Sequence, residues 1–249
     1  AKPVNKEITA CVIVIGNEIL SGRTQDLNVA YIGKRCDELG IRLMQTRIIP
    51  DVEATIVATI NECRRMFTYI FTTGGIGPTH DDITAASVAL AFAKKIERRA
   101  EAVEVMDNYY ESGKLTEARL KMADVPADSI LIDNPVSAAP GFQLENVFVM
   151  AGVPIIMQAM FEGIVDRLAG GKAMLMESVA TNLGESALAL ELSRLQDAYT
   201  DVSIGSYPYF KKGKVGVNLV IRSIEQSRLT QLKKELQLMI EKLGGKIVD

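Results

Sequence analysis

The residues with the clearest chemical meaning form one short segment, Thr72-Thr73-Gly74-Gly75-Ile76-Gly77-Pro78-Thr79-His80-Asp81-Asp82. Its glycines follow an apolar run and precede a helical pattern. Glycine lets the backbone approach a ligand closely and adopt positive φ at low cost. The helix that follows offers unpaired N–H groups and the positive end of its dipole. We therefore expect an anion-binding loop; the alternative is a plain tight turn in which Asp81 or Asp82 caps the helix.

Two adjacent carboxylates, Asp81 and Asp82, directly follow this loop. Carboxylates repel an anionic ligand unless a cation lies between them and the ligand. Oxygen ligands suit Mg²⁺, which usually keeps several waters and also takes substrate phosphates. We therefore predict a divalent-metal site on Asp82 and Asp81. His80 either joins this site or serves as a hydrogen-bonded turn residue.

Other segments end at the same edge of the expected sheet. Gly16 to Gly22 follows the first apolar run, and Asp51 follows another. Ligands of parallel sheets bind at the carboxyl ends of the strands. Asp51 has a purely structural alternative as the cap of the helix that follows it. Gly152-Val153-Pro154 ends the last strand of this region, and proline is favourable in the first turn of a helix.

The elements that position these residues alternate along the chain. Short apolar runs predict strands over 10–15, 41–49, 67–73, 129–132 and 146–150. Apolar residues at turn spacing predict helices over 26–39, 82–95, 100–111, 116–122 and 154–168, and another starting at Asp51. This alternation predicts an α/β fold with a parallel sheet covered on both faces.

The order of elements changes after Gly170-Gly171. Strands are expected over 172–181, 202–206, 214–221 and 246–248, with helices over 184–199 and 227–242. This pattern predicts a small α+β domain. We therefore expect two domains, covering 1–170 and 171–249.

Composition excludes several classes of protein. The net charge of −3, from 28 basic and 31 acidic residues, argues against a dedicated nucleic-acid binder. His80 is the single histidine, which excludes sites that need two imidazoles. Cys11, Cys36 and Cys63 form no CxxC pair and are expected to be buried, reduced thiols. No signal peptide or membrane-spanning run is expected, so we predict a cytoplasmic protein without a membrane partner.

The combination of motifs resembles a known family. Residues 16–24 with Asn28, then 72–84, 139–142 and 151–154, are similar to the molybdopterin-binding-like domain. The branch they resemble occurs at the N-terminus of the competence/damage-inducible protein CinA and in some eukaryotic FAD synthases. The resemblance covers residues 8 to about 169, and residues 205–208 resemble the small second domain of CinA. It implies a three-layer sandwich with a mostly parallel sheet, and a homo-oligomer, dimer or trimer.

The resemblance also implies roles for individual residues. Aspartates at the positions of Asp82 and Asp51 are functional in the molybdenum-cofactor enzymes of this superfamily. We assign catalytic roles to Asp82, Asp51 and Glu18, and metal binding to Asp82 and Asp81. One departure is Met150-Ala151-Gly152-Val153-Pro154, where the family usually has Leu-Pro-Gly-x-Pro. Substrate contacts are predicted for Gly16, Asn17, Ser21, Gly22, Thr24, Asn28, Thr73, Gly74, Gly75, Ile76, Gly77, Pro78, Thr79, His80, Gly141, Phe142, Gly152 and Pro154.

The activity implied by the resemblance is hydrolysis of a phosphoanhydride bond. The related domains act as a metal-dependent ADP-ribose pyrophosphatase in CinA-like proteins and as an FAD hydrolase in FAD synthases. We therefore expect a pyrophosphatase that uses Mg²⁺, Co²⁺ or Mn²⁺ and releases AMP from ADP-ribose or FAD. The alternatives are a molybdopterin-binding adenylyltransferase of molybdenum cofactor biosynthesis and a non-catalytic nucleotide-binding regulatory module. The sequence shows no counterpart of the deamidase domain of full CinA or the adenylyltransferase domain of FAD synthase, so those activities are not expected.

Overall fold

The computed structural model describes residues 7–211 and 213–248, and the chain divides into two compact units. The first unit spans Ala1–Gly171 and the second spans Lys172–Asp249. Residues 1–6, on which the expectation of no signal peptide partly rests, lie outside the described residues.

The first unit is built on a sheet of six strands in the order β2-β1-β3-β8-β7-β6. Strands β2, β1, β3 and β8 are parallel, whereas β7 and β6 run antiparallel to their neighbours. This arrangement confirms the mostly parallel sheet. The strand bounds are Thr9–Ile15 for β1, Arg42–Ile49 for β2, Tyr69–Thr73 for β3, Ile130–Ile132 for β6, Gly141–Leu144 for β7 and Val147–Met150 for β8.

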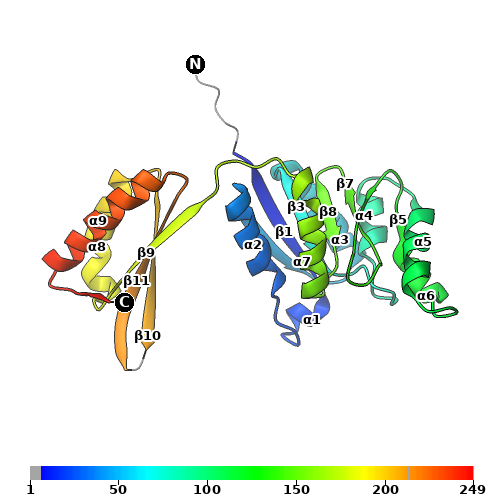
Figure 1. The fold of residues 1–249 in the computed structure, drawn as a ribbon, viewed down its shortest axis with the longest axis horizontal. Helices are drawn as coiled ribbons and strands as arrows, with labels where there is room; N and C mark the ends of the chain where they lie inside the picture. Colours follow the sequence, from blue (N-terminus) through cyan, green and yellow to red (C-terminus); the bar gives the residue numbers. More distant parts are fainter. Residues whose placement is uncertain (1–6, 212, 249) are drawn as a thin grey trace, which may run out of the picture. The chain divides into compact units, whose positions relative to one another are not determined.

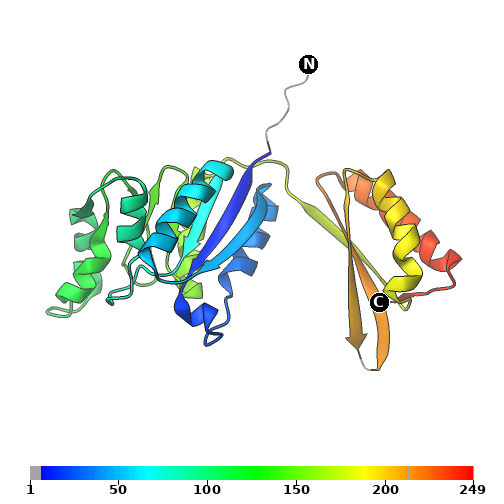
Figure 2. The same cartoon turned by 180° about the vertical axis from the view of Figure 1, so that it is seen from behind.

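Helices cover both faces of this sheet and make a three-layer unit (Figures 1 and 2). Helices α2 (Asn28–Leu39) and α7 (Pro154–Ile164) pack on one face. Helices α3 (Glu53–Met66) and α4 (Thr84–Ala91) pack on the other. Successive side chains of a strand point to opposite faces, so β1 contributes to both cores. Its Val12 belongs to the α2/α7 core and its Ile13 to the α3/α4 core.

Several local expectations at the strand ends were wrong. Asp51 does not cap α3, because its carboxylate accepts a hydrogen bond from the Asn17 amide at 3.0 Å, and Val52 stands at the cap position instead. Neither Asp81 nor Asp82 caps α4, whose cap residue is Ile83. Sequence analysis also missed the short helix α1 (Asn17–Leu20) and the strand β7.

The chain segment between α4 and β6 forms a small substructure with its own core. Strands β4 (Ile96–Arg98) and β5 (Asp124–Pro126) pair antiparallel. Helix α5 (Ala100–Tyr109), helix α6 (Glu117–Leu120) and the 3-10 turn η1 (Lys121–Ala123) connect them. Their core includes Ala102, Met106 and Ala123. This segment brings residues from the middle of the chain next to the loop after β3.

The second unit is a four-stranded antiparallel sheet with two helices, which confirms a small α+β domain. The strand order is β10-β11-β9-β12. Leu219 of β11 and Leu232 of α9 are fully buried in its core. The bounds are Leu175–Thr181 for β9, Glu185–Ala198 for α8, Ser203–Lys211 for β10, Lys214–Ser223 for β11, Gln226–Lys242 for α9 and Ile247–Val248 for β12.

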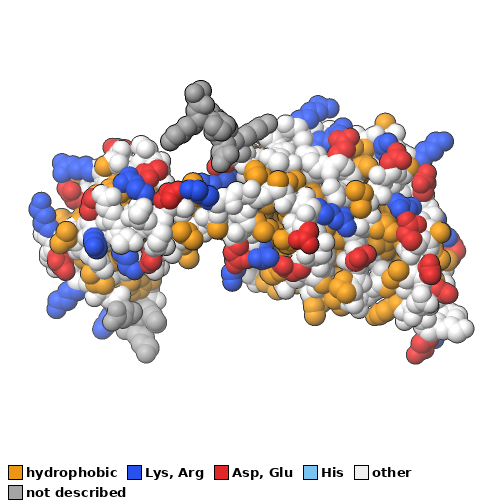
Figure 3. Space-filling model, turned by 45° about the horizontal axis from the view of Figure 1, so that its top comes forward, with side chains coloured by type: hydrophobic (Ala, Val, Ile, Leu, Met, Phe, Trp, Pro, Cys, Tyr) orange, Lys and Arg blue, Asp and Glu red, His pale blue; other side chains and the backbone are white. Residues whose placement is uncertain are grey.

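The three cysteine thiols are free and buried, as the sequence predicted. Burial raises the pKa of Cys36 to about 12, because a thiolate would lose its hydration there. No helix among residues 7–211 and 213–248 combines the length and the apolar character needed to cross a membrane. On the face shown in Figure 3, basic and acidic side chains are interspersed.

The aromatic cluster at the centre of the α2/α7 face gives a test of the fold. Phe71 is fully buried, and its ring lies 5.7 Å from that of Phe148 and 5.2 Å from that of Phe161. We expect Phe71→Ala to lower the free energy of unfolding by about 3–5 kcal/mol, because it leaves a cavity in a packed core. Urea unfolding followed by circular dichroism measures this change.

Leu90→Ala on α4 is the matched control, because Leu90 is 57% exposed. That variant should change the free energy of unfolding by no more than about 0.5 kcal/mol. Equal effects of the two substitutions would contradict the described packing.

Candidate functional site

The predicted site lies where β1, β3 and β8 end side by side. Gly74 follows β3 with a φ of 98°, and its amide donates to the Met150 carbonyl of β8 at 3.1 Å. A Cβ on Gly74 would lie 2.2 Å from the Ile15 carbonyl oxygen of β1. The Cα of Gly74 in turn lies 3.2 Å from where a Cβ on Gly152 would stand. Glycine is therefore required here by close backbone contact as well as by positive φ.

The loop after Gly74 presents free backbone donors. The amides of Gly75, Ile76 and Gly77 have no hydrogen-bond acceptor among the described residues. The loop is nevertheless held in place, because the Thr84 amide donates to the Gly75 carbonyl at 3.0 Å and the Thr84 hydroxyl to the Gly74 carbonyl at 3.1 Å. Successive free amides in such a turn form an anion-binding concavity. The geometry therefore favours the anion loop over a plain tight turn.

Asp82 closes the loop from its far end. Its Oδ2 accepts from the Thr79 amide at 2.9 Å and lies 2.8 Å from the Thr79 hydroxyl oxygen. The same oxygen lies 2.7 Å from where a Cβ on Gly77 would stand. The Asp82 carboxylate is thus fixed against the free amides rather than used as a helix cap.

Asp51 and Glu18 reach the loop from the neighbouring strand ends. Asp51 Oδ2 is held by the Asn17 amide, and its Oδ1 lies 3.5 Å from the position of a Cβ on Gly75. Glu18 lines the cavity that opens in front of the loop. The three residues predicted to be catalytic therefore come from three separate segments that converge on one loop.

The cavity in front of the loop has a volume of about 500 Å³. It joins a side pocket of about 60 Å³ through shared walls at Glu18, Thr24, Gly74, Gly152 and Pro154. Asn28 and Thr73 line only the side pocket. Predicted site residues that line the larger cavity are Glu18, Thr24, Gly74, Gly75, Ile76, Gly77, Pro78, Asp82, Gly152 and Pro154.

Other predicted site residues do not line these cavities. Gly141 is buried in β7, where a Cβ would lie 2.4 Å from the Val149 carbonyl oxygen, so its role there is packing. The Thr79 hydroxyl donates to Asp81, and this bond holds the pKa of the exposed Asp81 carboxyl below its usual value. The remaining residues outside the lining are Gly16, Asn17, Ser21, Gly22, Asp51, Thr79 and His80.

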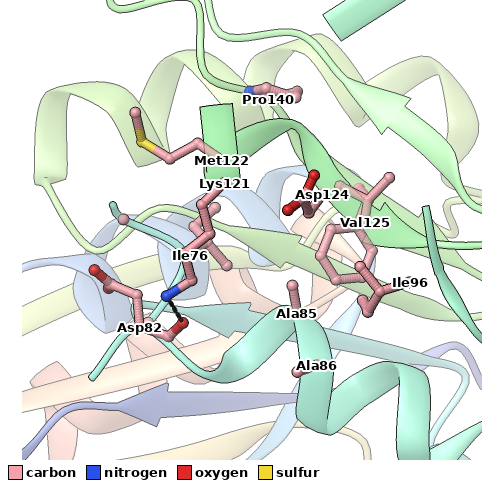
Figure 4. Close-up of a pocket in the computed structure, with 13 residues that line it drawn as sticks. Ile76, Asp82, Ala85, Ala86, Ile96, Lys121, Met122, Asp124, Val125 and Pro140 are labelled. Carbon is pink, nitrogen blue, oxygen red and sulfur yellow. Dashed lines mark hydrogen bonds between the residues drawn. The ribbon is translucent and has the colours of Figure 1, made fainter. Parts of the chain in front are cut away.

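A second cavity of about 130 Å³ lies beside the loop (Figure 4). Its walls are largely apolar and include the predicted residue Phe142. Lys121 stands at the loop, where its ammonium donates to the backbone carbonyls of Thr79 and, at 2.9 Å, Asp82. Asp124 lies nearby and accepts from Arg98 at 2.7 Å.

The sequence pattern did not predict Lys121 or the other cavity-lining residues that come from distant segments. Lys121 lies 39 residues after Asp82, and no local pattern links the two. Asn134 was detectable as a turn residue because it precedes a proline. It builds its turn by accepting from the amides of Val136 and Ser137 at 3.1 and 2.9 Å. The missed residues include Lys121, Met122, Asp124, Asn134, Ser137 and Ile156.

The carboxylates near the loop suit a metal ion that takes its other ligands from water and substrate. Within the described residues, no group of three or more His, Cys, Asp or Glu side chains could hold a metal by itself. Carboxylate oxygens of Asp82 and Asp51 nevertheless lie 2.7 and 3.5 Å from where Cβ atoms on Gly77 and Gly75 would stand. This donor set fits Mg²⁺ or a similar ion that takes its other ligands from water and substrate phosphates.

The Lys121 contacts predict how the loop is kept in shape. We expect Lys121→Met to raise amide hydrogen exchange of residues 79–82 about tenfold, because two hydrogen bonds from a charged donor are lost. Exchange measured by mass spectrometry reads this out. Lys94→Met is the matched control, since it breaks the Lys94–Asp128 ion pair elsewhere in the same unit. Unchanged exchange at 79–82 in the Lys121 variant would show that the loop does not depend on this contact.

Comparison with known proteins agrees with the resemblance found in the sequence. The family described as a probable molybdopterin binding domain matches residues 11–170. The FAD synthase middle domain matches residues 173–246. The two matches fall within the two compact units.

Individual relatives extend this picture. A protein of Archaeoglobus fulgidus is 35% identical over 94% of this chain and 98% of its own length. A probable FAD synthase of Caenorhabditis elegans is 28% identical over 96% of this chain, which spans 51% of that relative. The crystal structure of CinA from Thermoplasma acidophilum, at 31% identity, superposes with a TM-score of 0.60 over 64% of this chain and 96% of that chain. The chain therefore belongs to the molybdopterin-binding domain family and is a CinA-type member of it. Its second unit is of the FAD synthase middle-domain type.

Proposed function

We propose that this site hydrolyses the phosphoanhydride bond of a dinucleotide-like substrate, such as ADP-ribose or FAD, and releases AMP. The observation that carries the proposal is the run of free amides at Gly75, Ile76 and Gly77 with the Asp82 and Asp51 carboxylates beside it. Amides alone would suit any anion. Carboxylates next to them suit an anion that arrives with a cation, as a pyrophosphate does.

Each residue has a defined task in this proposal. The loop amides bind one phosphate and orient the anhydride. Asp51, which Asn17 holds in place, accepts the proton of a water that attacks phosphorus. A new P–O bond forms to that water, and the bridging P–O bond breaks, leaving two monophosphates. Asp82 would hold the divalent ion, whose contribution is to neutralise charge on the phosphates.

The relatives support a nucleotide as the substrate class. Proteins named probable FAD synthase match nearly the whole chain, and the second unit matches the FAD synthase middle domain. We propose a hydrolase rather than a synthase because cleavage of the anhydride needs only water as its second reactant, and Asp51 can accept the proton of that water. Mg²⁺, Co²⁺ and Mn²⁺ are the ions to test.

The molybdopterin alternative is favoured by the family match over residues 11–170. The cavity of about 130 Å³ beside Asp82 also has largely apolar walls. That function would show as tight pterin binding with ATP turnover. A regulatory module would instead bind nucleotide without turnover.

Asp82→Asn tests the proposal directly. Asparagine keeps an oxygen acceptor for Thr79 but removes the charge, so we expect AMP release from ADP-ribose or FAD to fall at least about 100-fold. Asp128→Asn is the matched control, because Asp128 is exposed, pairs with Lys94 and has a φ of 64° that asparagine tolerates. Chromatography of the products measures both rates. No AMP from either substrate with any of the three ions would refute the proposal.

A further inference from the structure

The side pocket of about 60 Å³ carries an unexplained polar feature. Asn28 is 4% exposed, and its Nδ2 donates to the Gly152 carbonyl at 2.8 Å. Its Oδ1 is buried and has no hydrogen-bond partner among the described residues. The same holds for the hydroxyl of Thr73, a residue that is 1% exposed. Leaving such atoms unpaired costs free energy, so two of them in one small pocket call for a partner.

The strand geometry separates Thr73 from its neighbour. Thr73 lies at the end of β3 and lines the side pocket with Asn28 of α2. Thr72 also has a buried hydroxyl without a partner among the described residues, but it does not line this pocket. Adjacent side chains of a strand point to opposite faces of the sheet. The chain therefore offers two similar threonines with unpaired buried hydroxyls, of which only Thr73 lines the pocket.

The chemistry of the pocket selects the kind of group it receives. Glu18 and Asp26 line it along with Asn28 and Thr73, whereas no Lys, Arg or His does. Asp26 already accepts from the Val29 amide at 2.9 Å. The pocket is therefore rich in acceptors and unsuited to a phosphate. It suits a neutral group that donates hydrogen bonds.

We infer that this pocket is a subsite for a sugar hydroxyl of the substrate, bound by Asn28 Oδ1 and the Thr73 hydroxyl. The inference rests on the proposed nucleotide function and identifies the part of the substrate next to the bound phosphate. The pocket shares Gly74 and Gly152 with the phosphate-binding cavity. In ADP-ribose every phosphate carries a ribose, so a phosphate on the loop places ribose hydroxyls nearby. A pocket of this volume admits a hydroxyl or ordered water, and water alone is the competing occupant.

Product-type ligands test the inference without catalysis. Calorimetry would compare AMP with 2′-deoxy-AMP and 3′-deoxy-AMP, and ribose 5-phosphate with 2-deoxyribose 5-phosphate. Wild-type protein should bind at least one deoxy compound roughly three- to tenfold more weakly than its parent, which corresponds to one lost hydrogen bond.

Three variants locate the effect. Thr73→Val should abolish the discrimination against that deoxy compound while leaving the urea midpoint unchanged or higher, because it removes an unpaired buried hydroxyl. Thr73→Ser keeps the hydroxyl and should retain the discrimination. Thr72→Val is the matched control and should also retain it.

Two results would overturn the inference alone. One is equal binding of parent and deoxy compounds by the wild-type protein, which would indicate that water fills the pocket. The other is unchanged discrimination in Thr73→Val. Failure of the wild-type protein to bind any of the phosphate compounds would instead overturn the proposed function, and the subsite with it.

Discussion

The site depends on how closely the backbone of Gly74 approaches its neighbours. A side chain at this position would collide with the Ile15 carbonyl of β1 at 2.2 Å. A Cβ on Gly152, which follows β8, would lie 3.2 Å from the Cα of Gly74. Because three strand ends meet here without side chains between them, the loop that follows β3 is anchored at its start. Its next three residues line a cavity, and their amides have no acceptor among the described residues.

The anchored position of the loop determines which charged side chains lie near it. Asp82 and Asp51 approach the positions of Gly77 and Gly75, so negative charge lies against a donor surface that would otherwise attract any anion. Lys121 stabilises the loop through backbone carbonyls and remains a cation beside the site. This balance favours an anion that brings its own cation. The side pocket at Asn28 and Thr73, which Glu18 and Asp26 also line, adds an acceptor-rich compartment next to the phosphate-binding cavity.

Sequence was informative where the signal was local. The continuous apolar run of β1 and the glycines at 74, 75 and 77 predicted a buried strand and a special loop, and both are present. Local reasoning failed for Asp51, because a residue before a helix looks like a cap although its carboxylate binds Asn17, 34 residues away. Local reasoning also failed for Lys121, because its contact with Asp82 joins residues that are 39 positions apart. Strand β7 was missed because its four residues include Gly141 and Gln143 and show no clear pattern.

A structure of the protein with Mg²⁺ and a non-hydrolysable ADP-ribose, in which a methylene group replaces the bridging oxygen, tests the central claim most directly. Our account predicts one phosphate on the amides of Gly75, Ile76 and Gly77, with the ion between that phosphate and the Asp82 carboxylate. It also predicts a ribose hydroxyl within hydrogen-bonding distance of Thr73. A pyrophosphate bound elsewhere, with the loop amides left in water, would contradict the account.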